Sequence, residues 1–123
     1  MKREDLSRIS TDELVNRFAE YAVQQDDASL ENDVAKVNRL FWKLKDIEQE
    51  LKDREGDQRS ALLRLYNHPN AQVRVKAAKA TLAIAPVQAR AALQALADSK
   101  EYPPALEAGM SIDMLNRGIY KPT

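Results

Sequence analysis

The sequence contains no cysteine, three glycines and one histidine in 123 residues. Without cysteine the chain forms no disulfide and has no thiol nucleophile, which is typical of a protein of a reducing compartment, the cytoplasm. Three glycines and five prolines leave little room for the many tight turns of an all-β protein. Ala, Leu, Lys, Arg, Glu and Gln are abundant instead, and these good helix formers favour an all-α fold.

Long apolar runs are also missing. No stretch approaches the length that crosses a membrane, and the opening MKREDLSRISTDEL lacks the apolar core of a secretory signal. We therefore expect a soluble cytoplasmic protein with no membrane partner. Its length fits one domain, residues 1–123, which is large enough to fold without disulfides or metals.

The net charge is zero but unevenly distributed. Residues 1–55 carry ten Lys/Arg against fourteen Asp/Glu, and residues 56–123 carry nine against five. The most basic run, residues 57–90, contains one carboxylate, Asp57. Its cations are Arg59, Arg64, Arg74, Lys76, Lys79 and Arg90. Such an uneven charge distribution can steer a charged partner or favour head-to-tail self-association. The alternative is that the basic run forms a solvated face without a partner.

Apolar periodicity and end signals predict six helices. Ser10 and Glu13 have capping-box spacing, Gly56 follows a helix end, and Asp57 and Asn70 are N-cap residues. The predicted helices cover residues 11–27, 31–54, 58–66, 71–84, 86–99 and 104–116. We group them as a long N-terminal hairpin (10–55), two shorter hairpins (57–85 and 86–117) and a tail (118–123).

The two central helices differ in their patterns. The helix at 31–54 has one apolar stripe, which we expect to lie on the later helices: Val34, Val37, Leu40, Phe41, Leu44, Ile47 and Leu51. The helix at 71–84 has two stripes, Val73, Ala77, Ala80 and Ile84 in one and Val75, Ala78 and Leu82 in the other. Its outward line is Gln72, Lys76, Lys79 and Ala83. A helix with apolar residues on most of its circumference is packed between neighbours.

A resemblance to HEAT repeats lies in this segment. Seven residues match the family's proline–x–x–x–valine–arginine–x–x–alanine–alanine pattern: Pro69, Asn70, Val73, Arg74, Ala77, Ala78 and Leu82. The resemblance implies that the proline starts the second helix of a hairpin, that the apolar positions pack on the previous hairpin, and that the arginine braces the turn between repeats. It implies a short right-handed α-superhelix of HEAT-like hairpins. Because a few repeats are needed for a stable stack, residues 10–55 would supply the third layer.

From Ser10 onward the chain also resembles an uncharacterised bacterial family, the domain of unknown function 2019 type with HEAT/armadillo-like repeats. The matching segments are STDELVNRFAE, NRLF, the HEAT stretch, AGM and GIYKPT. This resemblance implies a fold more than a function.

Residues for catalysis or metal binding are scarce. His68 lies in a His-Pro turn, where a structural or solvated role is expected, and one histidine does not form a metal site. The acidic residues 24–33 lack the spaced glycine of a calcium loop. No serine lies in a glycine elbow, and no phosphate-binding loop occurs. We expect no enzyme activity, catalytic residue, cofactor or metal.

The favoured function is a noncatalytic protein-interaction module, an adaptor or immunity-type protein. Trp42 and Tyr66 are candidate contact residues because aromatic side chains concentrate binding energy, although core packing would explain both. The candidate cationic contacts are Arg59, Arg64, Lys76 and Lys79. The alternative is nucleic-acid binding through the basic run from Arg59 to Arg90, against which stand the zero net charge and the few aromatic residues. The length of the helix at 31–54 also permits a homodimer.

Overall fold

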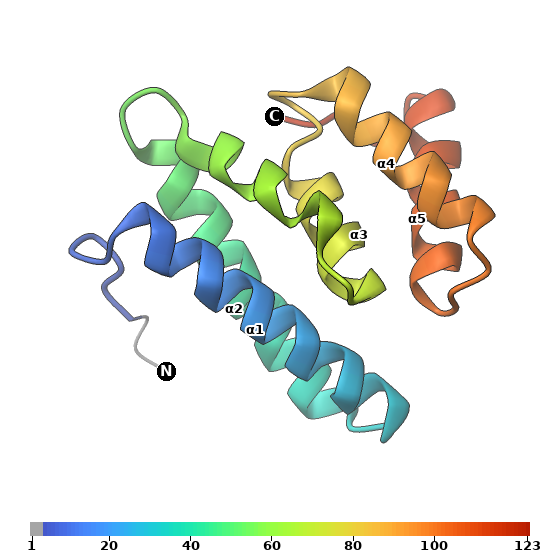
Figure 1. The fold of residues 1–123 in the computed structure, drawn as a ribbon, viewed down its shortest axis with the longest axis horizontal. Helices are drawn as coiled ribbons and strands as arrows, with labels where there is room; N and C mark the ends of the chain where they lie inside the picture. The colour runs from blue at the N-terminus through green and yellow to red at the C-terminus, as the bar shows by residue number, and fades with distance from the viewer. Residues whose placement is uncertain (1–3) are drawn as a thin grey trace. The chain divides into compact units, whose positions relative to one another are not determined.

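The computed structural model describes residues 4–123, which form five α-helices and one 3₁₀ helix, with no strand among them (Figure 1). The predicted all-α fold with six helices is confirmed. The helices are α1 (Thr11–Leu30), α2 (Val34–Asp53), η1 (Gln58–Asn67), α3 (Ala71–Ala80), α4 (Pro86–Asp98) and α5 (Pro104–Asn116).

The chain divides into two compact units, Met1–Ala61 and Leu62–Thr123, and the boundary falls inside η1. The first unit has eleven Lys/Arg against fifteen Asp/Glu in the sequence, and the second has eight against four. The division of charge that the sequence shows near residue 56 therefore nearly coincides with a structural boundary.

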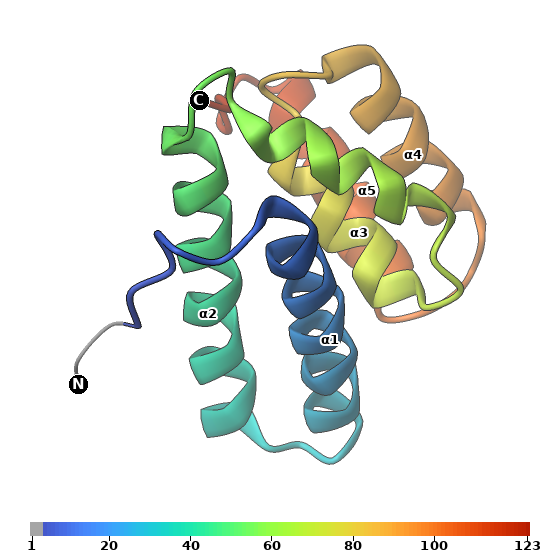
Figure 2. The same ribbon diagram turned by 60° about the vertical axis from the view of Figure 1, so that its left-hand side comes forward.

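The first unit is a helical hairpin. Helices α1 and α2 lie side by side and run in opposite directions (Figure 2). Ser10 caps α1, with its Oγ accepting from the Glu13 N–H at 3.1 Å, as predicted. Asp33 caps α2 through the Lys36 N–H, also at 3.1 Å. The two helices bury a common set of residues: Leu14, Val15, Phe18, Ala22, Gln25, Ala28, Leu40, Leu44, Ile47 and Leu51.

The predicted stripe of α2 is wrong at two positions. Val34 and Phe41 are 67% and 37% exposed, whereas Leu40 is buried. Leu40 lies one turn before Leu44 and occupies the inward direction, which turns Phe41 toward the side of the helix. Val34 is exposed because α2 begins only at this residue, after the loop that includes Asn32 at a φ of 58°.

Arg54 joins the chain before α1 to the end of α2. Its Nη2 donates to the carbonyl oxygens of Leu6 and Ile9, its Nη1 donates to Thr11 Oγ1 at 3.2 Å, and its Nε donates to Glu50 Oε2 at 3.0 Å. The guanidinium thus donates to two carbonyl groups that lie outside any helix, and the Leu6 carbonyl also accepts from the Ile9 N–H at 3.1 Å.

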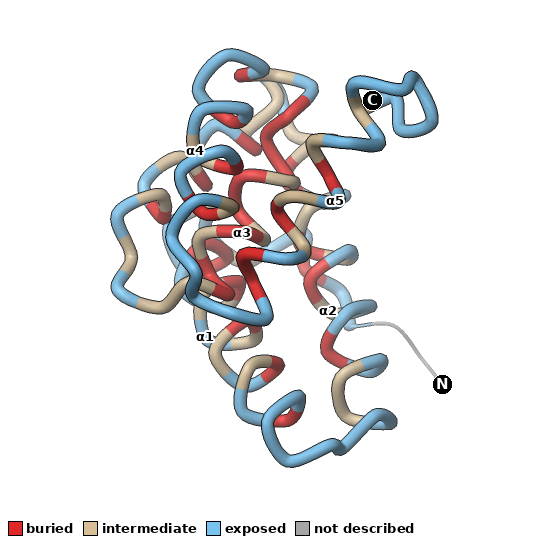
Figure 3. The backbone as a smooth tube through the Cα atoms, turned by 90° about the vertical axis from the view of Figure 1, so that its right-hand side faces the viewer, coloured by how far each residue is buried: buried red, intermediate tan, exposed pale blue. Residues whose placement is uncertain are grey.

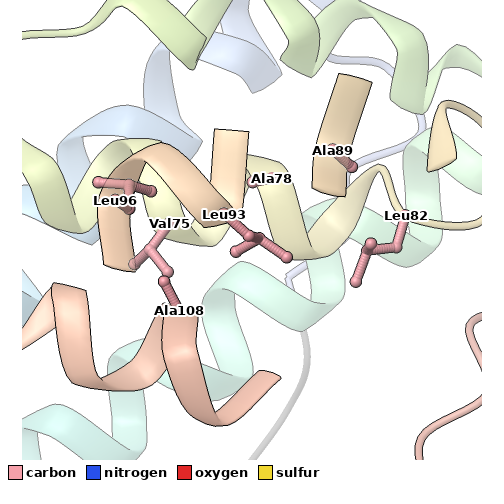
Figure 4. Packing of buried hydrophobic residues seen from close by; sticks show 7 residues of the cluster. All are labelled: Val75, Ala78, Leu82, Ala89, Leu93, Leu96 and Ala108. Atoms are coloured by element: carbon pink, nitrogen blue, oxygen red, sulfur yellow. The ribbon is translucent and has the colours of Figure 1, made fainter. Parts of the chain in front are cut away.

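The second unit has its own apolar core, where α3, α4 and α5 meet (Figure 4). Small alanines from each helix let the helices approach closely, and three leucines fill the remaining space. The core residues are Val75, Ala78, Leu82, Ala89, Leu93, Leu96 and Ala108.

The residues of both predicted stripes are buried except Ile84, which is half-buried and lies beyond the end of α3. Val75 and Ala78 lie in the core cluster, and Val73 and Ala77, which lie outside that cluster, also have no exposed surface. Gln72, predicted to face outward, is 8% exposed, so this assignment was wrong. The burial of six of the ten residues of α3 confirms a helix that is covered on most of its circumference.

Two helices differ from their predicted form. α3 ends at Ala80 instead of Ile84, because Thr81 Oγ1 donates a hydrogen bond to the Ala77 or Ala78 carbonyl oxygen (2.9 and 3.2 Å), which competes with continued helix hydrogen bonding. η1 lies where a helix was predicted but has 3₁₀ geometry over ten residues, long for this type.

The tube coloured by burial shows exposed residues along α2 and α4 (Figure 3), whereas no residue of α3 is exposed. Among residues 4–123, no helix combines the length and apolar character required to cross a membrane.

Candidate interaction surfaces

An aromatic pair lies exposed on α2. Trp42 is 64% exposed, and its ring meets the Phe41 ring edge to face, with centroids 5.1 Å apart and planes at 82°. Lys45 Nζ lies 5.6 Å from the Phe41 centroid, close enough for a cation–π contact. The pair therefore presents a large apolar surface on a regular helix. Contacts with Phe41 restrict the Trp42 ring on one side, and Lys45 lies over the Phe41 ring.

Tyr66, the other aromatic candidate, belongs to the core of the second unit. It packs against the core cluster, and its hydroxyl forms a hydrogen bond with Thr81 Oγ1. Burial raises the pKa of Tyr66, and the hydrogen bond with Thr81 lowers it by less, so the net shift is upward. These contacts give Tyr66 a structural role and leave Trp42 as the exposed aromatic candidate.

Arg59 is engaged within its own unit. Its side chain is 6% exposed, and its Nε and Nη2 donate to the two carboxylate oxygens of Asp57 at 2.8 and 2.6 Å. The hydrogen bond from the Arg59 side chain is the largest influence on Asp57 and holds its pKa below the ordinary 3.8. Asp57 also accepts from the Arg59 N–H, as the predicted cap of η1. Arg64 lies exposed on η1.

Lys76 and Lys79 of α3 share one carboxylate of α5. Their Nζ atoms lie 2.8 and 3.2 Å from Glu107 Oε2. Burial is the largest single influence and raises the pKa of Glu107, but the attraction of both lysines outweighs it, so this pKa lies below its ordinary 4.5. The cluster ties α3 to α5 and keeps one positive charge in excess.

Two more cations of the basic run contact other parts of the second unit. Arg74 Nη2 lies 2.7 Å from Glu101 Oε2, which links α3 to the loop before α5. Arg90 Nη1 donates to Asn116 Oδ1 at 3.0 Å.

The remaining residues of the HEAT-like motif form the start of α3. Pro69 precedes Asn70, whose Oδ1 accepts from the N–H groups of Gln72 and Val73 at 2.8 and 3.3 Å. His68 Nδ1 accepts from the Asn70 N–H at 3.0 Å, so the histidine has the structural role that its turn predicted. Within residues 4–123, no three His, Asp or Glu side chains gather in a way that would hold a metal ion.

Sequence reasoning missed a second apolar surface, on α5. Leu106, Met110 and Met114 are 58%, 55% and 42% exposed. Their four-residue spacing places them on one face of the helix, and we call these three residues the α5 stripe. The spacing was visible in the sequence, but the sequence does not show which apolar face of α5 the core uses.

The comparisons with known proteins identify a family and a solved structure that the chain resembles. The family described as "Domain of unknown function (DUF2019)" matches residues 12–116. A crystal structure of the protein RPA1889 from Rhodopseudomonas palustris CGA009 is 50% identical and superposes with a TM-score of 0.96. That alignment covers 98% of this chain and 100% of the other. No curated protein matched the chain.

Proposed function

The chain belongs to the family of domains of unknown function DUF2019, and we propose that it acts as a noncatalytic protein-binding module, an adaptor or immunity-type protein of the bacterial cytoplasm. The observation that carries the proposal is the exposure of Trp42, 64%, beside Phe41 on α2. A large apolar side chain that neighbouring residues leave open to water is a typical anchor for a protein partner.

Trp42 lies on a helix of 20 residues, and the edge-to-face contact with Phe41 restricts its ring. A restricted anchor loses little side-chain entropy on binding and gains from the burial of most of its surface. A partner with an apolar pocket would therefore obtain much of its binding energy from this single residue.

The proposal includes a HEAT-like architecture for the second unit, with η1 and α3 in one hairpin and α4 and α5 in another. The support is the capped start of α3 after Pro69, the burial of Val73, Ala77, Ala78 and Leu82, and the Arg74–Glu101 ion pair. Proteins built from such hairpins commonly present a face to a partner.

Nucleic-acid binding through residues 59–90 has less support. Arg59 is held by Asp57, and Lys76 and Lys79 share Glu107, so contacts with phosphate would have to compete with carboxylates already in place.

A quantitative pull-down from a lysate of the source organism tests the proposal. We expect the wild-type chain to enrich at least one protein, and Trp42→Ala to lose it while keeping the helical circular dichroism spectrum and melting temperature. Val87→Ala is the matched control, because Val87 is 80% exposed on α4 and plays no part in the proposal. Equal recovery by wild type and Trp42→Ala would contradict the role of Trp42.

A further inference from the structure

Trp42 lies in the longest segment of the first unit that has no carboxylate. Residues 34–45 of α2 carry four Lys/Arg and no Asp/Glu, and Asp33 and Asp46 bound the segment. The other positions of the unit carry seven Lys/Arg against fifteen Asp/Glu in the sequence. The exposed aromatic side chain is therefore surrounded by local positive charge within an otherwise acidic unit, and this charge restricts the chemistry of a partner.

Two cations lie beside Trp42 on the helix surface. Arg39 is exposed, and among residues 4–123 its side chain makes no ion pair or hydrogen bond. It lies three residues before Trp42 and four before Lys43, so it is the surface neighbour of both. Lys43 Nζ lies 5.4 Å from the centroid of the Tyr21 ring, a contact with an aromatic face and not with a carboxylate. We call Arg39, Trp42 and Lys43 the basic surface of α2.

The carboxylates of the same helix lie on the C-terminal side of this surface. Glu48 Oε2 is 3.4 Å from Lys45 Nζ, so these two charges offset each other. Asp46 is half-buried one turn after Trp42, and about 10 Å along the helix separates it from Arg39. The excess positive charge therefore lies beside Trp42 and toward the N-terminal end of α2.

We propose that the partner presents a short acidic protein segment to this surface, with apolar side chains around Trp42 and carboxylates on Arg39 and Lys43. This inference rests on the proposed function, since it names the chemistry of the partner for the same site. A guanidinium pairs with a carboxylate through two parallel hydrogen bonds, and burial of Trp42 beside it removes competing water. Because Arg39 has no ion pair to give up, a partner carboxylate gains this interaction without displacing another.

The charge of the remaining unit limits the extent of the acidic partner. Beyond residues 34–45 the carboxylates outnumber the cations, and they would repel a long polyanion. A nucleic acid carries a phosphate at every nucleotide and would meet this repulsion along its length. A few carboxylates beside apolar side chains match the basic surface without reaching past it. The distribution of charge therefore favours an acidic protein segment over a nucleic acid.

Photo-crosslinking from position 38 tests the chemistry of the partner. Asn38 is exposed one turn before Trp42, so a benzophenone amino acid at this position would capture a molecule that lies on the basic surface. The chain is mixed with a lysate of the source organism, with and without nuclease, and mass spectrometry identifies the crosslinked segment. We expect a protein segment with an excess of Asp and Glu, recovered equally from both lysates.

Charge reversal and salt test the role of Arg39 in binding the captured protein. We expect Arg39→Glu to raise the dissociation constant roughly tenfold or more, because carboxylates would then face one another. Its melting temperature should stay near that of the wild type, since Arg39 is exposed and unpaired in the free chain. Added salt should weaken the wild-type complex by screening these charges. Lys121→Glu makes the same change at an exposed position of the other unit and should bind like the wild type.

The outcomes separate this inference from the proposed function. If Trp42→Ala abolishes binding but Arg39→Glu binds like the wild type at every salt concentration, the acidic partner is wrong and the role of Trp42 stands. A crosslinked segment without excess carboxylates, or a crosslinked nucleic acid, also overturns the inference. If no protein is captured, or if both variants bind like the wild type, both proposals fail.

Discussion

Arg54 shows how one side chain organises a helical hairpin. It lies near the C-terminal end of α2 and donates to the carbonyl oxygens of Leu6 and Ile9, the Thr11 hydroxyl and the Glu50 carboxylate. We expect Arg54→Ala to lower the free energy of unfolding by about 2–3 kcal/mol, because it removes several hydrogen bonds from a charged group, among them the one that the Ile9 carbonyl accepts.

Urea unfolding measures this loss, and Arg54→Lys is the informative comparison. A lysine keeps the charge but does not reproduce the planar fork that reaches several acceptors at once. Arg54→Lys should therefore recover only a small part of the stability. Full recovery would mean that charge alone accounts for the role of Arg54.

Glu107 makes the stability of the second unit depend on pH. Burial raises its pKa, yet Lys76 and Lys79 together outweigh burial and lower it below 4.5. A carboxyl whose pKa is lower in the folded than in the unfolded state stabilises the fold above its unfolded pKa, and this contribution disappears as pH falls through the folded pKa. We expect the melting temperature to fall in acid below about pH 4.5.

The control is Glu107→Gln, followed by thermal unfolding at a series of pH values. The variant should be less stable than the wild type near neutral pH, and the difference should shrink as the pH falls below that range. A constant difference at all pH values would contradict the role of the Lys76–Glu107–Lys79 cluster.

Among the elements, α3 depends most on close packing. Ala78 has no exposed surface and lies in the core cluster, whereas Ala83, just after the helix, is exposed. We expect Ala78→Asp to cost about 3 kcal/mol or more, because it buries a carboxylate without a partner. Ala83→Asp should change stability by less than about 0.5 kcal/mol. Chemical denaturation of both variants compares them, and similar values would show that α3 tolerates charge on its core side.

Much of this element-level structure was predictable from the sequence. Ser10 and Asn70 are the N-cap residues that predict the starts of α1 and α3. Pro86 and Pro104 predict the starts of α4 and α5. The two apolar stripes of α3 predict its burial. These signals are local, since a cap or a proline acts within one turn of its helix. The early end of α3 was not predictable in this way. The Thr81 hydroxyl competes here with helix hydrogen bonds, but many threonines inside helices do not end them.

The interaction surfaces were less predictable, because local signals do not show which side chains the rest of the fold leaves exposed. The sequence indicated Trp42 as a candidate contact residue but did not show that it is exposed. We predicted that Phe41 would be buried, because Leu40 and Phe41 are both suitable for an inward position. Arg59 read as a contact residue, and its pairing with Asp57 requires the turn at Gly56 and Asp57, both of which have positive φ. Such outcomes depend on three-dimensional neighbours that a periodic pattern does not contain.

For the whole molecule, the opposite charges of the two units provide a test of the nucleic-acid alternative. The second unit has eight Lys/Arg against four Asp/Glu, and several of its cations face carboxylates. We expect fluorescence anisotropy with labelled duplex DNA to show no saturable binding even at low salt, where phosphate contacts are strongest. Binding that weakens steeply as salt is added would favour the alternative.

The boundary between the two units has a practical consequence for dividing the gene. No glycine- or proline-rich linker separates them, because residue 61 and residue 62 are consecutive positions of η1. A fragment that starts at Leu62 would begin in the middle of a helical segment, without the aspartate that caps it. Expression of the C-terminal half should therefore begin at Asp57, and a chimaera between relatives should exchange η1 entire.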